Sequence, residues 1–205
     1  MESSIPAFAV NTYRIQHELS LIKEKFKVTD GAGNPMLWVV TPSISLKKEF
    51  HVYTDEAGSN EVLNIKIHKL IEMAETWDVS EPNSGSSLGT IKSEVLKSMM
   101  RPSWQILSAN NQLIAEVSEN LAGAITGGLV PRKFIANSNE TQLAEYDQTY
   151  LSLMLQFSMN FEGDTNHVLD RRLGLAAGIV IAHKALTENH KTNNPMAGGF
   201  NNQPF

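Results

Sequence analysis

The chain has 205 residues, a length that suits a single domain able to bury a sizeable core. Apolar residues make up 41% of it and charged residues 19%, a balance that excludes a disordered protein. The formal net charge of −5 argues against non-specific nucleic-acid binding, and the lack of cysteine excludes disulfides and thiolate zinc sites.

The N-terminal residues 1–11 are predicted to form a flexible leader. They lack the charged-then-apolar pattern of a signal peptide, so we expect a soluble, cytoplasmic protein.

An aromatic-x-aliphatic triplet recurs along the first half of the chain, and a turn rich in Gly, Asn or Asp follows each copy. The leading aromatics Phe26, Phe50, Trp77 and Trp104 are 24, 27 and 27 residues apart. Alternation with a period of two places both apolar members of a triplet on one face of a strand. The turn residues tolerate positive φ, so the repeat predicts an antiparallel meander of hairpins.

The same alternation continues to the end of the first 160 residues and predicts twelve strands. A short helical turn is expected between Lys69 and Glu75, and a longer loop between Asn120 and Pro131. The predicted strands span residues 12–19, 24–29, 36–41, 49–55, 63–68, 76–80, 88–93, 103–107, 113–118, 132–136, 142–146 and 154–161.

A long apolar segment near the C-terminus has no polar side chain from Leu173 to Ala182. A surface helix shows only one apolar stripe, so we expect a helix over about residues 167–187 that is buried on all sides. It is too short to span a membrane, because His183 and Lys184 interrupt it. Gly174 and Gly178 within it would let the surrounding chain approach closely.

Strands and helix together predict a mainly β fold, a closed antiparallel barrel of about twelve strands threaded by the hydrophobic C-terminal helix. Closure removes the exposed edges of such a sheet, and the helix fills the lumen. The barrel domain is expected over residues 12–187. A disordered tail is expected over residues 188–205, which are rich in Asn, Gly and Pro.

These features resemble a known family. Strand pairs that carry aromatic-x-Val and then Asp-x-x-Gly, followed by an apolar helix that starts at Asp170-Arg171-Arg172, are similar to the LURP-one-related proteins of the tubby C-terminal-like superfamily. The resemblance covers about Thr12 to Leu186. It implies a twelve-stranded barrel around a central hydrophobic helix, in agreement with the pattern above.

The resemblance implies two kinds of ligand. Tubby domains bind phosphoinositide head groups, whereas phospholipid scramblases of the same superfamily act at membranes with calcium. The chain lacks the cysteine cluster and the Pro-rich N-terminal tail of scramblases. We therefore expect a non-enzymatic binding or scaffold domain for a phosphoinositide, another anionic lipid or a protein partner, with a scramblase-like, calcium-dependent protein as the alternative.

Adjacent basic residues are the candidates for contacts with an anionic head group, because several Arg or Lys side chains must converge on its phosphates. Three pairs of adjacent basic residues occur, Lys47-Lys48, Arg132-Lys133 and Arg171-Arg172, and Lys23 and Lys25 lie close by on another segment. The alternative for each pair is that it forms ordinary solvated surface or, for Arg171-Arg172, that it closes the mouth of the barrel. The candidate residues are Lys47, Lys48, Arg132, Lys133, Arg171 and Arg172.

The acidic segment before the helix is a weaker candidate for calcium, because hard cations take several oxygen ligands. Its oxygen-bearing residues are Glu162, Asp164, Asn166 and Asp170. Capping of the helix by Asp164, Thr165 or Asn166 explains this composition without a metal, so no metal site is predicted.

Catalytic and cofactor motifs are not evident. The six histidines lack metal-ligand spacing, no G-x-S-x-G elbow occurs, and neither a dinucleotide-binding loop nor a P-loop is complete. We therefore expect no enzymatic activity and no cofactor.

Overall fold

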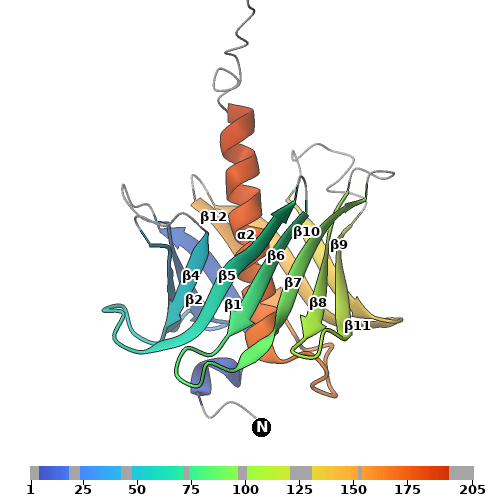
Figure 1. Cartoon of the computed structure of the whole chain (residues 1–205). Helices are drawn as coiled ribbons and strands as arrows, with labels where there is room; N and C mark the ends of the chain where they lie inside the picture. The colour runs from blue at the N-terminus through green and yellow to red at the C-terminus, as the bar shows by residue number, and fades with distance from the viewer. Residues whose placement is uncertain are drawn as a thin grey trace, which may run out of the picture.

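The computed structural model describes residues 5–18, 24–42, 48–71, 74–96, 101–120, 131–151 and 154–193. Twelve strands in these ranges form a closed barrel around a long helix (Figure 1). The elements are η1 (Pro6–Phe8), β1 (Thr12–Glu18), β2 (Lys25–Asp30), β3 (Pro35–Val40), β4 (Glu49–Tyr53), β5 (Glu61–Ile71), β6 (Ala74–Ser80), β7 (Ser87–Leu96), β8 (Arg101–Ser108), β9 (Leu113–Glu119), β10 (Lys133–Ser138), β11 (Thr141–Leu151), β12 (Met154–Asn160) and α2 (Arg171–Asn193).

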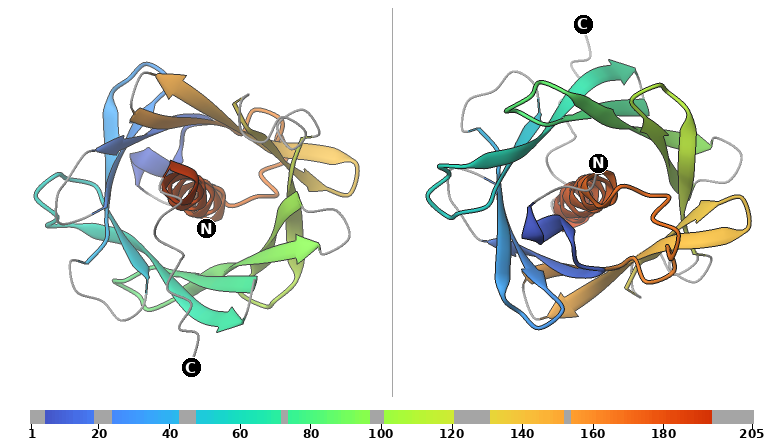
Figure 2. Two further views of the ribbon diagram at one scale, coloured as in Figure 1. Left: turned by 90° about the horizontal axis from the view of Figure 1, so that it is seen from above. Right: turned by 90° about the horizontal axis from the view of Figure 1, so that it is seen from below.

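Each strand pairs antiparallel with its neighbours in the chain, and β1 pairs with β12 to close the barrel. The predicted closed barrel of twelve strands around a C-terminal helix is therefore confirmed. The hairpin turns after β2, β4, β6, β8 and β10 lie at the end where α2 begins, which we call the lower end as drawn in Figure 1. The helix runs up the lumen and emerges from the opposite, upper end (Figures 1 and 2).

The aromatic repeat forms a belt inside the barrel. Phe26, Phe50, Trp77 and Trp104 are buried and come from alternate strands, and Phe134 of β10 continues the series. Ring centroids are 6.4 Å apart between Phe26 and Phe50, 5.5 Å between Phe50 and Trp77, and 5.4 Å between Trp104 and Phe134. The period of the sequence therefore corresponds to one inward aromatic for each pair of strands.

From Leu173 to His183 the central helix is buried on every side, as the composition of this segment predicted. The side chains of Leu175, Ala176, Ala177, Ile179 and Val180 have no exposed surface. Burial of this kind stabilises by roughly 25 cal/mol for each Å² of apolar surface removed from water. The lower half of α2 thus forms the inner part of the hydrophobic core, and the inward-facing side chains of the barrel strands form its outer part.

Both helical glycines allow close packing, because a Cβ on either would overlap a barrel side chain. At Gly174 it would lie 2.4 Å from Cε1 of Phe161, and at Gly178 it would lie 2.2 Å from Sδ of Met159. Neither distance is tolerated in a packed interior.

The helix starts four residues later than the predicted residue 167, and the physical reason is Asp164. Its carboxylate accepts hydrogen bonds from the backbone N–H groups of Val168 and Leu169, at 2.8 and 3.0 Å, and holds this segment in a turn. His167 has a φ of 52°. The N-cap is Asp170, whose Oδ1 accepts the N–H of Arg172 at 2.9 Å, and not a residue from 164 to 166.

The helix also ends later than predicted. It continues to Asn193, so residues 188–193, which we assigned to a disordered tail, are helical. Residues 194–205 lie outside the described part of the chain.

The described part of the leader packs against the barrel. Residues 6–8 form η1, and Ala7 and Phe8 are buried against the lower end of the barrel. The hydroxyl of Tyr13 donates a hydrogen bond to the carbonyl of Ala7 at 3.0 Å. A Phe beside small apolar residues supplies enough apolar surface to anchor so short a segment.

All twelve strand predictions correspond to strands, although several strands are longer than expected. The prediction of a helical turn between Lys69 and Glu75 was wrong where the structure can test it. β5 extends to Ile71 and β6 begins at Ala74, because the paired strands β5 and β6 continue their ladder upward. Residues 72–73 and most of the loop predicted between Asn120 and Pro131 lie outside the described residues.

The enclosed helix generates the first prediction. Gly178→Arg places an unpaired cation beside Met159 in the core, and we expect it to prevent cooperative folding. Thermal unfolding followed by circular dichroism measures this. Thr187→Arg, a part-exposed position higher on the same helix, is the matched control and should melt close to the parent chain. A soluble Gly178→Arg variant with a cooperative transition would contradict the buried position of the helix.

Candidate binding surfaces

The six basic residues predicted to contact a head group do not converge. Lys48 precedes β4 at the upper end, and Arg132 and Lys133 lie at the upper end of β10, half-way round the barrel from β4. Arg171 and Arg172 begin α2 at the lower end. Lys47 is outside the described residues. No single anion of head-group size could contact more than one of these pairs.

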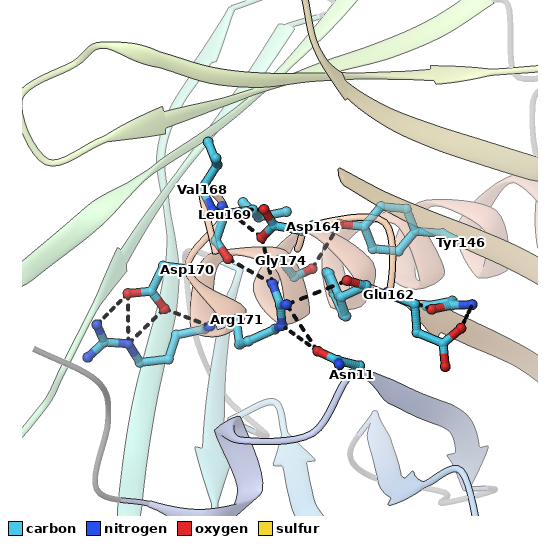
Figure 3. A network of polar contacts seen from close by, with 12 residues as sticks. Asn11, Tyr146, Glu162, Asp164, Val168, Leu169, Asp170, Arg171 and Gly174 are labelled. Carbon is cyan, nitrogen blue, oxygen red and sulfur yellow. Dashed lines mark hydrogen bonds and ion pairs between the residues drawn. The ribbon is translucent and has the colours of Figure 1, made fainter. Parts of the chain in front are cut away.

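Arg171 closes the lower end of the barrel (Figure 3). Its guanidinium, 9% exposed, donates to the carboxylate of Asp164 at 2.8 Å and to the carbonyl of Leu169 at 3.0 Å. It also donates to Oδ1 of Asn11 at 3.0 Å and lies 5.1 Å from the ring centre of Phe161. Arg171 therefore joins the leader, the turn before the helix and the helix itself, and it is not available to a ligand.

Two buried tyrosines complete this closure. Burial raises the pKa of Tyr13 to about 12, against the opposing effect of the Arg171 charge. Burial also raises the pKa of Tyr146, again opposed by Arg171. Both phenols are thus protonated at neutral pH, and Tyr146 donates its hydroxyl hydrogen to the carbonyl of Gly174 at 3.1 Å. Their role is structural.

Arg172 is also committed within the chain. It pairs with Asp170 and with Glu81, which follows β6. The hydrogen bond that Arg172 donates to the carboxylate of Asp170 raises the pKa of Arg172. Burial opposes ionisation of Asp170, but its hydrogen bonds from Arg172 outweigh that effect and lower the pKa of the carboxyl.

The acidic segment does not form a cation site. The oxygens of Asp164 and Asp170 accept hydrogen bonds from backbone N–H groups and from the two arginines. Glu162 is exposed and lies within hydrogen-bond reach of Asn160. Among the described residues, no three His, Asp or Glu side chains gather as metal ligands would.

The upper pair of predicted residues is paired with acids as well. Arg132 makes a two-pronged hydrogen bond to the nearly buried carboxylate of Glu119, at 2.8 and 3.0 Å. Lys133 bridges Glu145 and Asp147 on β11. The hydrogen bond to Glu145 raises the pKa of Lys133. Of the six candidates, only Lys48 is described, exposed and without an acidic partner.

Two polar contacts between the helix and the barrel wall at the upper end were not predicted from the sequence. Nδ1 of His183, a residue that is 5% exposed, lies 2.8 Å from a carboxylate oxygen of Glu24. Nζ of Lys184 lies 2.8 Å from a carboxylate oxygen of Glu75. The two residues that interrupt the apolar segment therefore attach the helix to the barrel wall.

Comparison with known proteins agrees with this architecture. A family model described as LURP-one-related matches residues 11–182, which is most of the chain. The chain belongs to the LURP-one-related family. No curated protein matches this LURP-one-related chain.

None of the helices in the described part of this LURP-one-related protein combines the length and the hydropathy needed to cross a membrane.

The outer wall of the LURP-one-related barrel carries a cluster of cations that the sequence did not single out. The cluster consists of Arg14 on β1 and of Lys25 and Lys27 on β2. Together with the neighbouring Trp38 on β3, we call it the basic face. Their strand neighbours Tyr13, Ile15, Phe26, Val28, Leu37 and Val39 point into the core with no more than 1% of their surface exposed, so the members of the basic face point outward.

The register brings these residues together. Lys27 lies directly opposite Trp38 on β3, and Arg14 lies opposite Thr29, the next outward residue after Lys27. Outward neighbours on paired strands are about 5–8 Å apart. Lys25 faces Glu18, the one carboxylate that the register places directly opposite a cation of the basic face.

The cations of the basic face are uncommitted. In the part of the chain that the structure describes, Arg14, Lys25 and Lys27 form no ion pair. Like charges on neighbouring strands repel each other, so this arrangement lacks an internal stabilising reason. Lys25 was noted from the sequence only as a basic residue, with Lys23, on a segment close to the adjacent basic pairs. Arg14 and Lys27 emerge only from the register of β1 and β2.

The network around Arg171 generates the second prediction. Arg171→Met leaves the carboxylate of Asp164 buried without a cation, and we expect it to lower the free energy of unfolding by about 3–5 kcal/mol. Urea unfolding measures the change. The matched control is Lys66→Met, which removes an ion pair to Glu49 whose lysine is 51% exposed and should cost less than about 1 kcal/mol. Equal losses in the two variants would contradict a structural role for Arg171.

Proposed function

We propose that this LURP-one-related protein is a non-enzymatic binding domain that docks on anionic lipid head groups through the basic face. The observation that carries the proposal is the set of three unpaired cations, Arg14, Lys25 and Lys27, on adjacent strands of one outer wall. Phosphoinositides and phosphatidylserine are the lipids with suitable negative charge.

The location of the basic face suits a surface-bound protein. Arg14, Lys25 and Lys27 lie on a broad barrel wall and not in a deep pocket, so they can approach several head groups together. The half-buried indole of Trp38 lies between these cations and β4. Trp and long basic side chains are favoured at membrane interfaces, where each places an apolar body beside a charged layer.

The expected affinity is modest. A basic residue close to an anionic membrane contributes roughly 1 kcal/mol, so three contribute about 3 kcal/mol, or about a hundredfold preference over neutral vesicles. The net charge of −5 opposes this preference at long range, and salt weakens it further.

The alternative, a calcium-dependent protein that inserts its terminal helix, gains no support from the geometry. The apolar part of α2 fills the lumen, and withdrawing it would expose the aromatic belt to water. The acidic segment that would hold calcium is engaged by Arg171 and Arg172.

The third prediction tests lipid docking by co-sedimentation with neutral, phosphatidylserine and phosphoinositide vesicles, each with calcium or with a chelator. We expect binding to both anionic vesicles that weakens with salt and does not depend on calcium. The triple variant Arg14→Gln, Lys25→Gln, Lys27→Gln should lose it.

The matched control is the triple variant Lys66→Gln, Lys92→Gln, Lys133→Gln, which has the same net charge but alters other walls of the barrel. It should bind vesicles as the parent chain does. Binding that falls equally in both triple variants would show a general charge effect and refute the basic face, and absence of binding to any anionic vesicle would refute lipid docking.

A further inference from the structure

A groove of about 600 Å³ lies on the outer wall over β8, β9 and β10. It is on another side of the barrel from β2 of the basic face, since three strands lie between β2 and β10 in one direction and five lie between β2 and β8 in the other. Its outward-facing lining includes Gln105 on β8, Glu116 on β9 and Asn137 on β10.

These three residues form one row across the wall. Glu116 lies directly opposite Gln105 on one side and directly opposite Asn137 on the other. Side chains that face each other across antiparallel strands are about 5 Å apart, so the carboxylate lies between two amides in a row roughly 10 Å wide.

The row has no internal partners. Within the described residues, the side chains of Gln105, Glu116 and Asn137 make no hydrogen bond and no ion pair. Carboxylates on the neighbouring walls behave differently, because Glu145 contacts Lys133 and Asp78 contacts His68. In the groove, by contrast, the exposed carboxylate of Glu116 is flanked by two amides that have no hydrogen-bond partner among the described residues.

The chemistry of the row matches a guanidinium. A carboxylate accepts two parallel N–H bonds from the planar fork of arginine, and three further N–H donors remain. The register places Gln105 and Asn137 on the two sides of Glu116, where their amide carbonyl oxygens can accept hydrogen bonds from those donors. A lysine ammonium has three donors and no such planar fork, and an anionic lipid would be repelled by Glu116.

The groove also offers apolar contact to a peptide. Leu113, which is 54% exposed, lines the groove at the lower end of β9, and the half-buried Ile114 follows it. Such surface beside a cation site suits an extended peptide that carries an apolar residue near its arginine.

From this row we infer that the groove binds an extended segment of a partner protein through an arginine side chain, whose guanidinium lies on Glu116 between Gln105 and Asn137. A cation that would repel the guanidinium, Lys92 on β7, lies directly opposite Gln105 but outside the groove lining. Lys92 weakens the attraction and competes for Glu116. This binding is independent of the basic face and of any lipid.

The fourth prediction concerns a blocked hexapeptide with one leucine and one arginine among glycines and serines, titrated into the full ¹⁵N-labelled chain. We expect saturable shifts of backbone amides in β8, β9 and β10. Replacing arginine by the isosteric neutral citrulline should weaken binding about tenfold or more, and lysine should bind less tightly than arginine.

Variants of the protein locate the contact. Glu116→Gln should weaken the arginine peptide about tenfold and leave the citrulline peptide almost unchanged. Lys92→Gln should bind the arginine peptide as tightly as the parent chain or more tightly. Glu56→Gln, an exposed carboxylate in the turn after β4, is the matched control and should have no effect.

Several results would overturn the inference. They are equal affinity for the arginine and citrulline peptides, insensitivity of the arginine peptide to Glu116→Gln, and the absence of shifts in β8 to β10 at millimolar peptide. Because the vesicle experiment uses other residues and another probe, either proposal can fail while the other stands.

Discussion

The rest of the structure depends on the enclosure of an apolar helix by a closed wall of strands. The helix has no polar face at the level of Leu175 and Ile179, and neither residue has any exposed surface. The barrel in turn needs the helix, because a lumen lined by large aromatic side chains would otherwise be open to water. Neither part can be stable alone, and we expect them to fold as one cooperative unit.

This constraint explains why the most conspicuous charges of the sequence are structural. A chain that enters and leaves a closed lumen has to satisfy its polar groups at both ends. Arg171 and Asp164 do so where the helix enters, and His183 with Glu24 does so nearer the upper end. Buried pairs of this kind are costly to break and are a poor place for reversible ligand binding.

The architecture was predictable because regular patterns of apolar residues along the sequence correspond to it. Alternation along each strand, the regular spacing of Phe26, Phe50 and Trp77, and the unbroken apolar segment all reflect burial, which local composition reports directly. The residues that we propose for binding were not predictable in the same way. Arg14 and Lys27 become neighbours only through the register of β1 and β2. Gln105, Glu116 and Asn137 lie in one row only because β8, β9 and β10 pair in the observed register. Adjacency in the sequence selected Arg171 and Arg172 instead, which the fold uses to close the barrel.

The central claim is that the helix stays within a rigid barrel while binding takes place on the outer wall. Native-state hydrogen exchange of the amides from Leu175 to Ala182 tests it most directly, with and without phosphatidylserine vesicles and calcium. We expect these amides to exchange only through global unfolding, with the same opening free energy as the slowest strand amides under every condition. Exchange through a smaller opening, above all one that vesicles or calcium promote, would contradict the claim and show that the helix leaves the barrel.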